Sequence, residues 1–129
     1  MLSSECLDEL RSAWLPNITD TGLSRLLDLL EKGSPLLISG CFTQAIPMGC
    51  LASQIAWNHP ATARLNVEAG ISWLHQVAGL NPATSAVLRE WDRRGAGDLD
   101  LRADLVAELR TERDHRQARR AAGRELVCG

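Results

Sequence analysis

The sequence has no tyrosine and only one phenylalanine, so tryptophan supplies nearly all of its aromatic surface. The four tryptophans are spread along the chain, one in each of four segments with a helical pattern: Trp14, Trp57, Trp73 and Trp91. Large aromatic side chains bury much apolar area and dominate protein cores. We therefore expect the tryptophans to anchor their segments to a common core.

The Asn-Gly and Asp-Gly pairs that mark tight β-hairpins are also absent, whereas helix start and stop signals are frequent. Leucines recur three or four positions apart between Asp20 and Lys32, and Gly33 follows in the position of a helix cap. Comparable patterns predict helices over residues 3–15, 20–32, 46–58, 66–80, 82–94 and 99–122. The predicted fold class is all-α: a compact single-domain bundle of about five to six short helices with a longer, charged C-terminal helix. We expect one domain over residues 1–122 and a frayed tail over 123–129.

The segment before the third predicted helix is read as a buried connector or a short helical turn, because the apolar run of residues 35–42 has no partner strand in the sequence. Pro47 suits the first position of the helix that follows. Cys50 would then be its fourth residue, where the helix dipole lowers the pKa of a thiol.

Two later helices have their own markers. Val67, Ile71 and Leu74 recur at helical spacing and predict one buried face. Asn81 is placed to cap the next helix, with Pro82 at its first position.

Charge is missing from the middle of the chain. No Asp, Glu, Lys or Arg occurs between Gly33 and Ala63, yet prolines and glycines interrupt this stretch, so we expect no membrane span. The net charge of −2 gives no general attraction to polyanions. Four cysteines without a CxxC pair, and an N-terminal stretch that reaches acidic residues early, predict a cytoplasmic protein with reduced thiols.

No motif specifies a reaction, so we expect the protein to act by binding and not by catalysis. A small domain cannot bury the whole uncharged segment, which predicts that residues 34–80 contact a partner. The leading hypothesis is an accessory or regulatory subunit that forms a homo-oligomer through this segment. The interface candidates are its large apolar residues: Phe42, Met48, Trp57 and Trp73.

A metal or small-ligand binding protein, or an enzyme, is the alternative. Its candidate residues are two cysteines and two histidines: Cys41, Cys50, His59 and His75. They lack the close spacing usual for zinc, so they would have to converge from separate elements. We expect no cofactor, with a transition metal as the alternative. Arg64 and Glu68, four positions apart, form a candidate polar pair.

The C-terminal helix is rich in arginine, which raises the second alternative of a nucleic-acid-binding regulator. The candidate residues are Arg113, Arg116, Arg119 and Arg120. Acidic residues are interspersed among them, a pattern typical of ion pairs along a helix. We therefore do not expect nucleic acid to be the partner.

Overall fold

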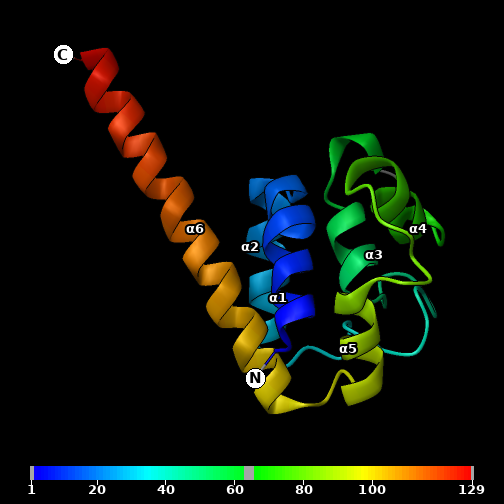
Figure 1. The fold of residues 1–129 in the computed structure, drawn as a ribbon. Helices are drawn as coiled ribbons and strands as arrows, with labels where there is room; N and C mark the ends of the chain where they lie inside the picture. The colour runs from blue at the N-terminus through cyan, green and yellow to red at the C-terminus, as the bar shows by residue number, and fades with distance from the viewer. Residues whose placement is uncertain (1, 63–65, 129) are drawn as a thin grey trace.

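A computed structural model describes residues 2–62 and 66–128 and confirms the all-α fold (Figure 1). Six α-helices and no strand occur in this part of the chain. The helices are α1 (Ser4–Glu9), α2 (Asp20–Glu31), α3 (Leu51–Ala56), α4 (Ala69–Ser72), α5 (Ala86–Arg94) and α6 (Leu99–Cys128). Wider π-helical turns extend α1 over Leu10–Trp14 and α4 over Trp73–Val77, and 3₁₀ turns cover Leu15–Asn17 and Pro60–Thr62.

The first two helices form where the sequence predicts them. Ser3 accepts a hydrogen bond from the backbone of Cys6, and Thr19 accepts one from Gly22, so each helix begins with a side-chain cap. The helix of residues 4–14 ends before Pro16, as predicted, and a single 3₁₀ turn follows it. Helix α2 buries its leucines against the core.

The connector between α2 and α3 differs from the prediction at its end. Helix α3 begins at Leu51, four residues after Pro47, the predicted first helical residue, and Pro47 lies in a turn after a cis peptide bond. The reason is that residues 36–50 pair their own backbone groups: Ile38 N donates to Gly49 O over 3.1 Å, and Cys50 N donates to Phe42 O over 2.8 Å. The apolar run of residues 35–42 is thus a connector whose only sheet-like contact in the described chain is isolated bridging to Gly49.

Helix α4 presents a different face from the one predicted. Trp73 and Leu74 are fully buried, but Val67 and Ile71 are exposed. The helix begins at Ala69, after Val67, and its π-helical extension shifts the angular positions of later residues. Gly70 lies against Ser53 of α3 so closely that a Cβ atom there would be 2.7 Å from the Ser53 hydroxyl oxygen.

Helix α5 begins at Ala86 with Ser85 as its cap, so the predicted start at Pro82 is wrong. Asn81 instead closes a turn, in which its side chain accepts from Ala83 N over 2.9 Å. The end is as predicted, because Gly95 follows the helix with a positive φ of 90°.

Helix α6 begins after Asp98, whose carboxylate accepts from Leu101 N over 2.9 Å, as expected for a cap. Its first half packs along α2, and its second half extends beyond the other helices (Figure 1). Arg102 is almost fully buried at this contact and donates to carbonyl oxygens of Ala96, Leu29 and Ser34, with its guanidinium 5.9 Å from the ring centre of Trp91.

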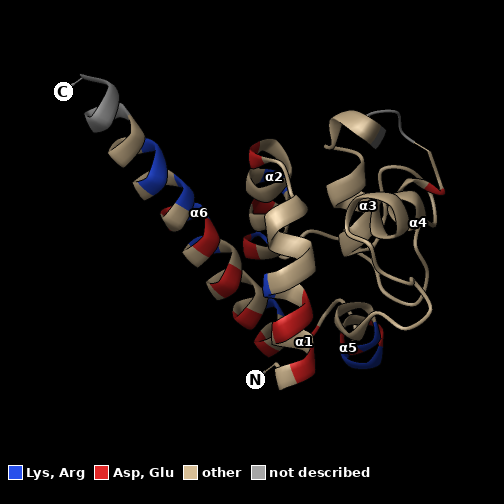
Figure 2. Ribbon diagram, turned by 45° about the horizontal axis from the view of Figure 1, so that its top comes forward, with Lys and Arg blue, Asp and Glu red and all other residues tan. Residues whose placement is uncertain are grey.

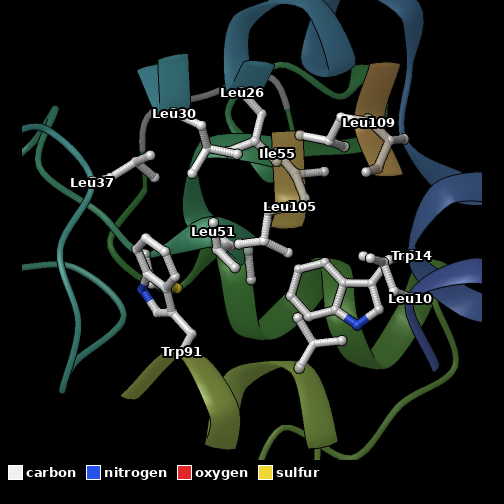
Figure 3. Packing of buried hydrophobic residues seen from close by; sticks show 14 of the residues in the cluster. Leu10, Trp14, Leu26, Leu30, Leu37, Leu51, Ile55, Trp91, Leu105 and Leu109 are labelled. Carbon is white, nitrogen blue, oxygen red and sulfur yellow. The ribbon is translucent and has the colours of Figure 1, made fainter. Parts of the chain in front are cut away.

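The core lies between α6 and α2 on one side and α3 and α5 on the other (Figure 3). Trp14, Trp73 and Trp91 are at most 1% exposed, and Trp14 meets Trp73 edge to face with ring centres 5.4 Å apart. The expectation that tryptophans anchor the segments to a common core is confirmed, because all four belong to this cluster.

Candidate functional site

The uncharged middle of the sequence also lies together in the structure. Charged residues lie on α1, α2, α5 and α6, whereas α3, α4 and the connector before α3 carry almost none (Figure 2). Helices α1 and α2 lie between α6 and the pair α3 and α4 (Figures 1 and 2). Helices α3 and α4 and the connector form a region that we call the uncharged side; charged residues of α5 border it, and Glu68 is exposed within it.

Three large apolar side chains are exposed on the uncharged side. Ile46 is 37% exposed, Val67 is 58% exposed and Ile71 is 40% exposed. The Thr43 hydroxyl donates to Val67 O over 3.1 Å, which holds the connector beside the segment before α4. We call the exposed part of residues 34–80 the uncharged surface.

Two of the four predicted interface residues are core residues instead. Trp73 is 0% exposed and Trp57 is 8% exposed, so neither offers its ring to a partner. The Trp57 indole donates to Asn66 O over 3.0 Å, whereas Trp73 Nε1 has no hydrogen-bond partner among the described residues. Phe42 and Met48 are half-buried and contribute to the uncharged surface.

The apolar residues most exposed on this surface were not found from the sequence. Val67 and Ile71 fit a helical stripe, which predicted burial. The stripe is misleading because the helix begins only after Val67. Ile46 precedes Pro47 in a turn. The sequence placed Ile46 at the start of a helix, whereas α3 begins only at Leu51, so its exposure was not predicted.

The four candidate metal ligands lie in different surroundings. Cys41 is exposed and Cys50 is buried. His59 Nδ1 accepts from Ala61 N over 3.1 Å, and His75 is exposed on the turn after α4. Among the residues that the structure describes, no three His, Cys, Asp or Glu side chains are grouped so that they could hold a metal ion. The geometry thus lends no support to the metal alternative.

The predicted activation of Cys50 is wrong. Cys50 occupies the cap position before α3, not its fourth residue. Burial raises the pKa of the Cys50 thiol, and hydrogen bonds from Ser53 and Ala52 only partly oppose this rise. The thiol is therefore protonated at neutral pH and unsuited to act as a nucleophile.

The candidate pair of Arg64 and Glu68 cannot be followed, because Arg64 lies outside the described residues. Glu68 itself is exposed, and its backbone N donates to the Asn66 side chain over 2.8 Å.

All four candidate arginines of α6 contact carboxylates of the same chain. Arg116 lies 2.9 Å from Asp20 and 2.6 Å from Glu112, and its guanidinium also donates to Leu15 O over 2.7 Å. Arg120 pairs with Asp20 at 3.0 Å. Longer contacts join Arg119 to Glu112 at 3.5 Å and Arg113 to Asp114 at 3.6 Å. These acids neutralise much of the charge that a phosphate backbone would need.

No helix in the described part of the chain combines the length and apolar character needed to cross a membrane. Comparison of the chain with protein-family models, with curated proteins and with solved structures finds no match. A proposal for the function therefore depends on the surfaces described above.

Proposed function

We propose that the protein is a helical interaction protein, an accessory or regulatory subunit that binds a second copy of itself through the uncharged surface. The observation that carries this proposal is the exposure of Ile46, Val67 and Ile71 on a side of the molecule almost without charge. Burial of apolar surface drives most protein association.

Single exposed apolar residues are common, and the charge pattern around them is what favours a contact. A twofold axis brings each residue of a surface close to the same surface of the partner. Charged groups near such an axis would repel their own copies, and among its described residues the uncharged surface carries a single exposed charge, Glu68. Each Å² of apolar area that association removes from water contributes about 25 cal/mol of favourable free energy.

We also propose that the protein acts in the cytoplasm. Three cysteines, Cys6, Cys41 and Cys50, are free thiols, and a reducing compartment preserves that state. Because Cys41 is exposed, association should be measured in reducing buffer, where an accidental disulfide cannot join two chains.

The test is sedimentation velocity across a range of protein concentrations. We expect a mass above 14.1 kDa that rises with concentration. Ile71→Asp should weaken this association at least about tenfold, because it places a charge in the centre of an apolar contact.

Leu99→Asp is the matched control. Leu99 is 77% exposed at the start of α6, outside the uncharged surface, so the same kind of change there should leave the mass unchanged. A chain that stays monomeric at every concentration, or equal effects of Ile71→Asp and Leu99→Asp, would overturn the proposal.

A further inference from the structure

The end of α5 holds the backbone of the connector before α3. The Trp91 indole donates to Ile38 O over 2.7 Å, and the Ser39 hydroxyl oxygen accepts from Ala96 N, just after the helix, over 3.1 Å. Trp91 is 1% exposed, so this attachment begins in the core. Two consecutive residues of the connector are thus fixed to the same end of α5.

A third contact continues the series. Gly40 N donates to Asp92 Oδ1 over 2.8 Å, and the connector turns at Gly40 with a positive φ of 86°. Both residues are exposed. A hydrogen bond to a charged acceptor is stronger than one between neutral groups. We call the attachment of residues 38–40 to α5 the α5 clamp.

We propose that the α5 clamp holds the connector in the shape that self-association requires, and that Asp92 is its positioning residue. This role rests on the proposed function, because the connector is part of the uncharged surface and carries Phe42, Ile46 and Met48. Asp92 acts on that surface through Gly40 and does not itself contact the second copy.

The other half of the connector is anchored separately, by α3. The Ser53 hydroxyl donates to Phe42 O over 2.8 Å, and the Gln54 side chain donates to Pro47 O over 2.8 Å. Ser53 and Gln54 are buried, so these bonds are part of the core. Cys41 lies between the two anchors, so loss of the clamp would free the chain on the N-terminal side of Phe42.

Arg102 supports the clamp from within the core. Its guanidinium lies 5.9 Å from the ring centre of Trp91 and donates to Ser34 O, near the beginning of the connector, over 3.4 Å. Packing therefore fixes the buried part of the clamp. Asp92 is the member that can be replaced without opening the core, because it is exposed.

Preorganisation is the physical reason that the clamp should matter for association. A loop that is already ordered in the free protein loses no further conformational entropy when a partner binds. Without the Asp92 contact, residues 39–41 would sample more conformations, and binding of the second copy would have to order them together with Phe42. The loss should therefore appear as weaker association and not as an unfolded core.

The experiment compares two replacements of Asp92 by sedimentation velocity in reducing buffer, at a temperature where every chain is folded. Asp92→Ala should weaken self-association roughly threefold or more, because ordering the freed loop opposes binding. Asp92→Asn keeps a side-chain oxygen that accepts from Gly40 N, so it should restore most of the association. Asp8→Ala is the matched control and should leave association unchanged, since Asp8 is likewise exposed but lies on α1.

Hydrogen exchange measured by NMR tests the clamp directly, whether or not the chain associates. The Gly40 amide should exchange roughly tenfold faster in the Asp92→Ala chain than in the unmodified chain, because it loses its acceptor. In the Asp92→Asn and Asp8→Ala chains its rate should stay close to the unmodified value.

The outcomes distinguish this role from the proposed function. An unmodified chain that stays monomeric at every concentration would overturn both. If the unmodified chain associates, equal association of the Asp92→Ala and Asp8→Ala chains would overturn the role of the clamp alone. Equal weakening by Asp92→Ala and Asp92→Asn would also overturn it, because the carboxylate would then contact the second copy itself. An unchanged exchange rate of the Gly40 amide in the Asp92→Ala chain would exclude the clamp.

Discussion

Glu9 joins two helices that are far apart in the sequence, and its removal provides a sharp test of the fold. Its carboxylate accepts from the Ser85 hydroxyl over 2.6 Å, and from the backbone N atoms of Ala86 and Val87 over 2.9 and 3.0 Å. It also accepts from the Trp14 indole over 3.0 Å. The carboxylate thus caps the N-terminal end of α5 from the end of α1, where the helix dipole favours a negative charge.

The expected loss follows from these four contacts. A hydrogen bond to a charged group contributes about 1.5–3 kcal/mol, but bonds that share one acceptor do not add fully. We expect Glu9→Gln to lower the free energy of unfolding by about 2 kcal/mol, since it keeps one acceptor oxygen and loses the charge. Glu9→Ala should cost about 4 kcal/mol, because it leaves every donor without its partner.

Urea unfolding followed by circular dichroism measures these losses, with Glu5→Gln as the control. Glu5 lies one turn earlier on α1 and, among the described residues, makes an exposed ion pair with Arg89 at 3.2 Å, so its replacement should cost less than about 1 kcal/mol. Equal midpoints for the Glu9→Gln and Glu5→Gln chains would refute this account of α5.

The pH dependence gives a second check. Burial alone would raise the pKa of Glu9, but hydrogen bonds from Ser85, Val87, Ala86 and Trp14 outweigh it and lower the pKa. The stabilisation is therefore complete above the pKa of an unfolded glutamate, about 4.3, and is lost as the pH falls toward the lower folded value. The difference between the unmodified and Glu9→Gln chains should shrink below that pH, and a difference that grows there would contradict the reasoning.

Two further predictions concern the side of the molecule that carries α3. Gly70→Ala should lower the free energy of unfolding by about 2 kcal/mol, because the new Cβ atom would be 2.9 Å from the backbone N of Ser53. Thermal unfolding compares the Gly70→Ala chain with a Gly97→Ala control, whose Cβ would meet nothing within 4 Å. Equal unfolding midpoints for the two chains would count against the close packing of Gly70 on Ser53. Cys41 as the sole cysteine should react with a disulfide reagent at once, whereas Cys50 as the sole cysteine should react only as the chain unfolds. Rapid labelling of folded Cys50 would show that its burial is wrong.

The sequence predicts helices best where the signals are local. The leucines of α2 and the cap at Asp98 act within their own helix, so both elements form as expected. The start of α5 could not be predicted, because Glu9, which is 77 positions earlier in the sequence, stabilises it. The start of α3 was misplaced for a similar reason: Pro47 fits a helix locally, but the backbone of residues 36–50 pairs with itself.

The candidate sites depend even more on tertiary structure. The uncharged segment was evident from composition, yet composition could not say which of its apolar residues are buried. Trp73 and Ile71 are two positions apart, and one is in the core while the other is exposed. The reactivity predicted for Cys50 required a helix start that the connector prevents, so burial decides its pKa instead.

The tryptophan pair in the core also makes the protein its own optical probe. With no tyrosine in the chain, near-ultraviolet absorbance and emission come almost wholly from indoles, and three of the four are at most 1% exposed. Unfolding moves these indoles from a dry interior to water and should shift their emission to longer wavelength. Docking at the uncharged surface leaves the surroundings of these three indoles unchanged, so their emission reports the unfolding of the core and not the contact between two copies.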